Sequence, residues 1–276
     1  MPSSNPAFSR GFGNAGNGAQ YPGWGAQPQQ YGAPAQYGAP AQYDPYSARA
    51  PYTTPATRYM TMDDVVTKTG ISFLVTVLSA AAVWAMPGQA AWGLALPAVL
   101  VAFVLGLVIS FKQIANPVAT LAYGGLYGVA LGAISEAFNT IYPGIVMQAL
   151  IGTFGVFAGM LVVYKTGAIR VTPKMTRWVV GALVGALVLM LVNFLVGIFT
   201  TGDPLGLRSG GPVAIGFSLV MIGIAAFMLL LDFDMADEAI RRGAPAKFAW
   251  YIAFGLLVTV VWLYMEILRL LSYFRE

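Results

Sequence analysis

The fold is decided by apolar stretches such as PVAIGFSLVMIGIAAFMLLLD, which runs from Pro212 to Asp232. A helix needs about 20 apolar residues to cross the hydrocarbon core of a bilayer. Six further stretches of similar character lie on either side of it along the chain. The sequence therefore predicts an all-α polytopic membrane protein with seven transmembrane helices. We place them at residues 69–86, 92–111, 118–138, 144–164, 178–199, 212–232 and 250–273.

The composition supports this class and excludes several others. The chain is 58% hydrophobic and only 9% charged, whereas a soluble domain has roughly 25% charged residues. It contains no Cys and no His, which excludes disulfides, thiol catalysis, His-based metal sites and a Ser–His–Asp triad. An intramembrane aspartyl protease would need two Asp residues that face each other. Asp232 or Asp234 opposite Glu266 is a poor match to such a pair, because one of the two acids is Glu. We therefore expect neither an enzyme nor a bound cofactor.

The chain divides into a tail and a membrane domain. Residues 1–57 are rich in Gly, Ala, Pro, Gln and Tyr, and the segment Gln30–Ala35 recurs from Gln36. Such a composition buries too little apolar surface to offset its ordering entropy, so we expect disorder there. The membrane domain is predicted at residues 58–276, opened by a helix that Thr61 can cap.

Cationic residues predict the orientation. Connections after even-numbered spans carry eight, namely Lys112, Lys165, Arg170, Lys174, Arg177, Arg241, Arg242 and Lys247, whereas those after odd-numbered spans carry only Arg208. Positive charge favours the cytoplasmic side, so we expect a cytoplasmic N-terminus and a C-terminus outside. Arg269 and Arg275 oppose this assignment unless the end of the chain stays buried or emerges only in part.

Glycines at four-residue spacing predict close helix packing. Small residues at this spacing let helix backbones approach one another in lipid. They occur in the third span as Gly124, Gly128 and Gly132 and in the fifth as Gly181 and Gly185, while in the fourth Gly152, Gly155 and Gly159 follow one another at three and four residues.

Carboxylates inside the apolar runs are the candidates for function. Asp232, Asp234 and Glu266 interrupt the last two spans, and an ionisable group in a bilayer is costly enough to indicate a role. Glu266 could form an ion pair with Arg269 on its own helix. Alternatively it faces Asp232 or Asp234, shares a proton with it, and binds Ca²⁺ when deprotonated. Glu136 is a secondary candidate that could simply reach water.

Several segments resemble one known family. The stretches Leu263–Leu271, Leu231–Asp234, Gly124–Gly132 and Val163–Gly167 are similar to segments of the Bax inhibitor-1 (transmembrane Bax inhibitor motif) family, in its actinobacterial branch. The resemblance covers residues from about 59 to 276. It implies a bacterial inner membrane protein in which six helices surround a central seventh.

The resemblance also implies a pH-sensitive Ca²⁺ leak with one gating acid in each of the last two helices. The position in the last helix falls on Glu266, and the other on Asp232, Asp234 or, as a third choice, Asp237. Two departures stand out: the last-helix acid is Glu rather than Asp, and the segment from Phe233 to Met265 is longer than expected. A plain antiparallel hairpin would therefore keep the acids apart.

Three functions follow as hypotheses. The first is a leak channel for Ca²⁺, gated by a proton shared between carboxylates. The second is an interaction protein that restrains other membrane proteins, such as a membrane-bound AAA protease, with the Tyr-rich tail as its handle. The third is an H⁺-coupled cation antiporter, which buried acids also fit. The expected partners are thus the lipid bilayer, Ca²⁺, protons and other membrane proteins, and not nucleic acid.

Overall fold

The computed structural model describes residues 58–86, 88–200 and 203–275. The predicted tail, with its expected disorder, lies outside the described residues. Within them, seven helices are long and apolar enough to cross a membrane, as predicted. They are α2 (Met62–Trp84), α3 (Gly88–Lys112), α4 (Pro117–Ile141), α5 (Ile145–Thr166), α6 (Pro173–Thr200), α7 (Pro212–Arg241) and α8 (Ala249–Tyr273), and α8 is preceded by the short 3₁₀ helix η1 (Ala246–Phe248).

Helix α2 begins where its cap was predicted. The Thr61 hydroxyl accepts a hydrogen bond from the Asp64 backbone N–H, and the Asp64 carboxylate accepts one from the Thr61 N–H. This reciprocal arrangement satisfies two N–H groups that a helix start leaves without partners. Asp64 also pairs with Arg58 at 3.2 Å and Lys68 at 3.7 Å. The cap therefore joins the segment before α2 to the helix itself.

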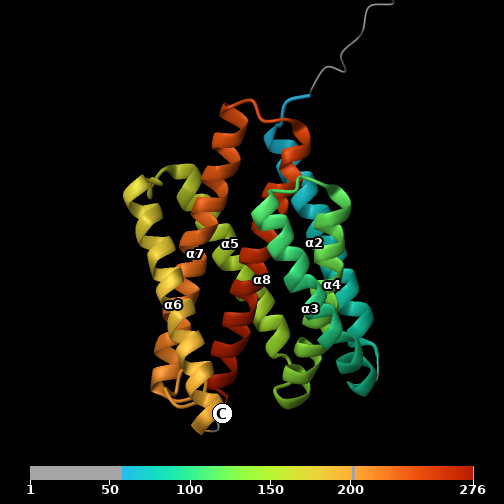
Figure 1. The fold of residues 1–276 in the computed structure, drawn as a ribbon, viewed down its shortest axis with the longest axis vertical. Helices are drawn as coiled ribbons and strands as arrows, with labels where there is room; N and C mark the ends of the chain where they lie inside the picture. Colours follow the sequence, from blue (N-terminus) through green and yellow to red (C-terminus); the bar gives the residue numbers. More distant parts are fainter. Residues whose placement is uncertain (1–57, 87, 201–202, 276) are drawn as a thin grey trace, which may run out of the picture. The chain divides into compact units, whose positions relative to one another are not determined.

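Helix α8 is the centre of the bundle (Figure 1). In the apolar 18-residue stretch of α8, 72% of the residues are buried inside the protein, against 50% in the corresponding stretch of α4 and 6% in that of α6. It packs against α2, α4, α5 and α7, while α3 packs mainly on α4 and α6 on α7. The expected central seventh helix is confirmed, with α3 and α6 forming the outer parts of the bundle.

Glycines bring α2 and α4 into backbone contact. A Cβ atom added at Gly128 would overlap the Ser79 hydroxyl and the Thr76 carbonyl, and one at Gly132 would overlap the Ala80 backbone. The prediction of close packing is therefore confirmed for the third span. A Cβ added at Gly155, Gly159, Gly181 or Gly185 would meet nothing within 4 Å, so at these positions of α5 and α6 the spacing does not mark a tight contact.

Helix α7 is longer than its apolar stretch predicted. The predicted span ended at Asp232, whereas the helix continues to Arg241. Hydropathy predicts only the apolar part of a helix. The turns of α7 after Asp232 are amphipathic, so the prediction ended before them. They bury Phe233 and Ala236 against the core, while Glu238 pairs with Arg241 and Arg242 at 2.6 Å each. This extension places Asp232 well inside the bundle.

The two ends of the bundle are held by different contacts. At one end the segment before α2 pairs with the α7–α8 connection: the Met60 N–H donates to the Ala244 carbonyl and the Ala246 N–H to the Arg58 carbonyl, both at 2.8 Å. At the other end, Arg275 donates to the Pro143 carbonyl at 3.0 Å. The start of α2 and the end of α8 thus lie at opposite ends (Figure 1), as an odd number of spans requires.

Candidate functional site

Asp232 is a buried carboxylate at the contact between α7 and α8. Its residue is 8% exposed, and its Oδ2 accepts a hydrogen bond from the Thr259 hydroxyl at 2.6 Å. Gly255, one turn before Thr259, lies beside the carboxylate, because a Cβ added there would be in ordinary van der Waals contact with Oδ1 at 3.6 Å. Asp232 therefore packs against the face of α8 that carries Gly255 and Thr259.

Two cavities meet at this carboxylate. The larger, about 700 Å³, is lined by Val171 just before α6, by residues of α6 and α7 that include Asp234, and by the α7–α8 connection with Phe248 of η1. The smaller, about 210 Å³, is lined by Ser110 of α3 together with residues of α7 and α8. Asp232 lines both cavities. It is thus buried among side chains yet borders space in which an ion or water could sit.

The charges around Asp232 leave it uncompensated. The larger cavity also contains Asp234, Glu238 and Arg242, of which the last two pair with each other. Besides Asp232, the smaller cavity is lined by one further titratable side chain, that of Tyr251. Among the ion pairs formed by the described residues, none includes Asp232. Its direct partner is a neutral hydroxyl, which is unusual for a carboxylate so far from solvent.

Glu266 belongs to a second polar cluster further along α8. The residue is 2% exposed, and its Oε1 lies 3.0 Å from Arg269 Nη1 and 3.6 Å from Arg208 Nη2. The ion pair with Arg269 was one of the two predicted alternatives and is confirmed. The contact from Arg208 crosses from the α6–α7 connection to the central helix, so this acid has two cationic partners.

Asp203 fixes the connection that carries Arg208. It accepts hydrogen bonds from the Asn193 amide at 2.7 Å and from the Arg208 backbone N–H. Burial by itself would raise the pKa of Asp203, but these hydrogen bonds and the nearby Arg208 guanidinium outweigh it and hold the pKa below its usual value. The charged carboxylate is therefore the favoured form, and it holds the α6–α7 connection in place over Glu266.

The predicted direct pair of Asp232 and Glu266 does not form. Asp232 faces Thr259 of α8, and Glu266 follows seven residues later, which is about 10 Å along a helix axis. The extension of α7 to Arg241 explains the separation, because it shifts Asp232 away from the helix end without bringing it as far as Glu266. A plain antiparallel hairpin keeps the two acids apart, as the sequence indicated.

The other candidates lie in separate places. Asp237 accepts a hydrogen bond from the Tyr164 hydroxyl of α5 at 2.7 Å. Asp234 is half-buried and lines the larger cavity, and Glu136 accepts a bond from Thr140 at 3.1 Å on its own helix. In the part of the chain that the structure describes, no three acidic side chains gather where they could hold a metal ion. Asp232, Asp234 and Glu266, the candidate Ca²⁺ ligands, therefore do not gather as one group of three among the described residues.

Sequence reasoning missed Thr259, Arg208 and Tyr164 as partners of these acids. Thr259 lies in an apolar run where a single hydroxyl carries little signal, although Gly255 four residues earlier indicates a close approach on the same helix face. Arg208 was counted only for topology. Its contact with Glu266 joins residues 58 positions apart, and nothing local in the sequence predicts it.

Together with the fold, the Asp232–Thr259 contact and the two arginines beside Glu266 define a class. It is a seven-helix membrane protein whose central helix carries buried polar contacts. A comparison with family models identifies the family. The model described as "Bax inhibitor 1 like" matches residues 5–276. The chain belongs to this family, as its sequence resemblance predicted. No curated protein matches it.

Proposed function

We propose that the membrane domain is a pH-sensitive leak for Ca²⁺ in which Asp232 exchanges a proton for the cation. The observation that carries the proposal is a buried carboxylate that borders two cavities and has a neutral hydroxyl as its direct partner. An ionised carboxylate is costly in such surroundings without a counter-charge. Asp232 therefore holds either a proton or a cation, and the two states exclude each other.

The chemistry around Asp232 suits Ca²⁺. The Asp232 carboxylate and the Thr259 hydroxyl are oxygen donors, which hard cations prefer, and water in the adjoining cavities can complete the ligand set. Asp234 also lines the larger cavity, while Glu238 there is paired with both Arg241 and Arg242.

The Glu266 cluster is suited to closing the other end of the bundle. Arg208 reaches Glu266 from the α6–α7 connection and so ties that connection to the central helix. The tie depends on the attraction between the Glu266 carboxylate and the Arg208 guanidinium, so it holds while Glu266 is ionised. Uptake of a proton by Glu266, or movement of Arg208, would release the connection and open the path beyond Asp232.

Flux of Ca²⁺ into liposomes containing the purified full chain tests the proposal. Wild type is compared with Asp232→Asn and, as a matched control on the same helix, Asp237→Asn. We expect the Asp232 variant to lose the dependence of flux on pH between mildly acidic and mildly alkaline solution, and the Asp237 variant to keep it. The reverse result would assign the exchange to Asp237 and its partner Tyr164.

The proposed release of the α6–α7 connection from α8 is tested with a separate variant. Glu266→Gln removes the charge that holds Arg208, so we expect a larger basal flux while the dependence on pH that Asp232 confers is retained. An unchanged basal flux would show that the Arg208–Glu266 contact has no role in closing the path. The same liposomes distinguish a leak from an antiporter, because only an antiporter drives Ca²⁺ against its own gradient when a proton gradient is imposed.

A further inference from the structure

A group of cations without an acidic partner lies where α5 ends and α6 begins. Lys165 is in the last turn of α5, Arg170 is in the connection, and Lys174 and Arg177 are in the first turns of α6. The sequence contains no Asp or Glu between Glu136 and Asp203. Within the described residues, none of these four cations takes part in an ion pair. The bundle thus leaves a concentrated positive charge beside α6.

Apart from Lys112, Lys247 and Arg275, the other cations of the described chain form ion pairs. Arg58 and Lys68 pair with Asp64, and Arg241 and Arg242 pair with Glu238. Orientation of the protein in the membrane requires positive charge on one side, but it does not require that the charge be free of acidic partners. The unbalanced charge therefore leaves room for an anionic ligand.

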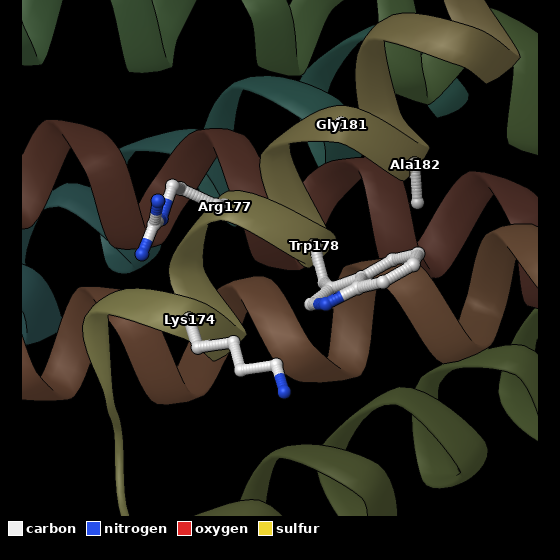
Figure 2. A pocket seen from close by; sticks show the side chains of 5 residues that line it. All are labelled: Lys174, Arg177, Trp178, Gly181 and Ala182. Atoms are coloured by element: carbon white, nitrogen blue, oxygen red, sulfur yellow. The ribbon is translucent and has the colours of Figure 1, made fainter.

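A pocket on the surface of α6 adjoins these cations. Lys174, Arg177, Trp178, Gly181 and Ala182 line it, and we call these five residues the α6 surface. Figure 2 shows Lys174, Trp178 and Ala182 following one another along the helix, with Arg177 beside them. Their spacing of four residues places the cations at one end, the indole in the middle and small residues beyond it.

Beyond the two cations, in the direction of Gly181 and Ala182, the α6 surface is apolar and open. Trp178 is 72% exposed, and only 6% of the residues in the apolar 18-residue stretch of α6 are buried in the bundle. A Cβ atom added at Gly181 or Gly185 would meet nothing within 4 Å, so the glycines leave a shallow path along the helix. Indole rings of this kind favour the boundary between head groups and acyl chains.

We propose that the α6 surface is a binding site for one anionic phospholipid. Lys174 and Arg177 would bind the phosphate through charge-assisted hydrogen bonds, Trp178 would pack against the glycerol region, and an acyl chain would follow Gly181 and Ala182. The order of cation, indole and small apolar residues along α6 matches the order of groups in a phospholipid. The site is separate from Asp232 and Glu266, and the proposal does not depend on the Ca²⁺ leak.

Native mass spectrometry of the full chain with phosphatidylglycerol, and in parallel with phosphatidylcholine, tests the site. Lys174→Gln/Arg177→Gln removes both cations of the α6 surface. Lys112→Gln/Lys247→Gln is the matched control, because it removes two exposed cations that also lie outside the ion pairs of the described residues. We expect the first variant to bind phosphatidylglycerol at least about tenfold more weakly, the effect of losing a charge-assisted contact, and the control to bind as wild type does.

Gly181→Leu provides a second variant that changes no charge. It would obstruct the path for the acyl chain where the structure has open space, so we expect normal folding and weaker binding of phosphatidylglycerol. Equal binding of both lipids by wild type, or equal loss in the cation variant and its control, would overturn the proposal. A dimer that Gly181→Leu dissociates would also overturn it, because a second copy of the chain would then be the occupant.

Discussion

The Thr259 hydroxyl donates a 2.6 Å hydrogen bond to the Asp232 carboxylate, and this contact joins α7 to the central helix. We predict that Thr259→Val weakens the binding of Ca²⁺ by the purified protein, because it removes an oxygen donor beside the carboxylate. Thr259→Ser keeps the hydroxyl and should bind as wild type does. Isothermal titration with Ca²⁺ measures both, and equal affinity in the Val and Ser variants would exclude Thr259 as a ligand.

Thermal unfolding should detect the ion pairs of Glu266. Arg269→Gln and Arg208→Gln each leave a buried carboxylate with one partner fewer, which costs about 1–3 kcal/mol. We expect the larger loss from Arg269→Gln, since its contact with Glu266 is 3.0 Å long against 3.6 Å for Arg208.

A double-variant cycle isolates the contact that crosses between elements. If Arg208 and Glu266 interact, the combined Arg208→Gln/Glu266→Gln variant should be destabilised by less than the sum of the two single variants. Strict additivity of the two changes would mean that the 3.6 Å contact contributes nothing to the free energy of unfolding.

Packing of α2 on α4 gives a third prediction. Gly128→Ala should destabilise the fold by about 1–3 kcal/mol, the usual cost of overpacking, because the added methyl would overlap Ser79 and the Thr76 carbonyl. Gly155→Ala is the matched control in α5, where the added methyl meets nothing within 4 Å. It should be neutral or slightly stabilising, since Ala favours the helix over Gly. Similar unfolding temperatures for both variants would contradict the close contact.

The Asp203 carboxylate gives a prediction about pH. Its pKa is lower in the folded protein than the usual value, so its contribution to stability is complete above the unfolded pKa of about 4 and disappears as the pH falls through the folded pKa. Asp203→Asn should therefore lower the unfolding temperature at neutral pH and make little difference in strong acid. Asp63→Asn, at an exposed position at the start of α2, is the control and should change neither.

The same reasoning limits what Asp203 can do in function. Because it stays charged from weakly acidic to alkaline solution, it cannot produce a change of Ca²⁺ flux near neutral pH. Should Asp203→Asn abolish such a change while the protein stays folded, the assignment of the proton exchange to Asp232 would be wrong.

Much of the fold could be predicted because it depends on properties that are local in sequence. Bilayer thickness sets the length of each apolar helix, so the spans were found to within a few residues, except where polar turns extend α2 and α7. The Thr61 cap and the Glu266–Arg269 pair were predictable for the same reason, since each involves residues three positions apart. The glycine spacing predicted the close contacts of α4 and of Gly152 in α5, but it was misleading for Gly155 and Gly159 in α5 and for α6, because spacing cannot show whether a neighbouring helix is present.

The sequence by itself determined that this is a seven-helix membrane protein of the Bax inhibitor 1 like family with carboxylates in its last two spans. Only the tertiary structure decided the partners of those carboxylates. Asp232 faces Thr259 rather than Glu266, and Glu266 receives Arg208 from a distant connection. The physical reason is that contacts between helices depend on where each helix ends and how it is rotated about its axis, and side-chain packing across the whole bundle sets both.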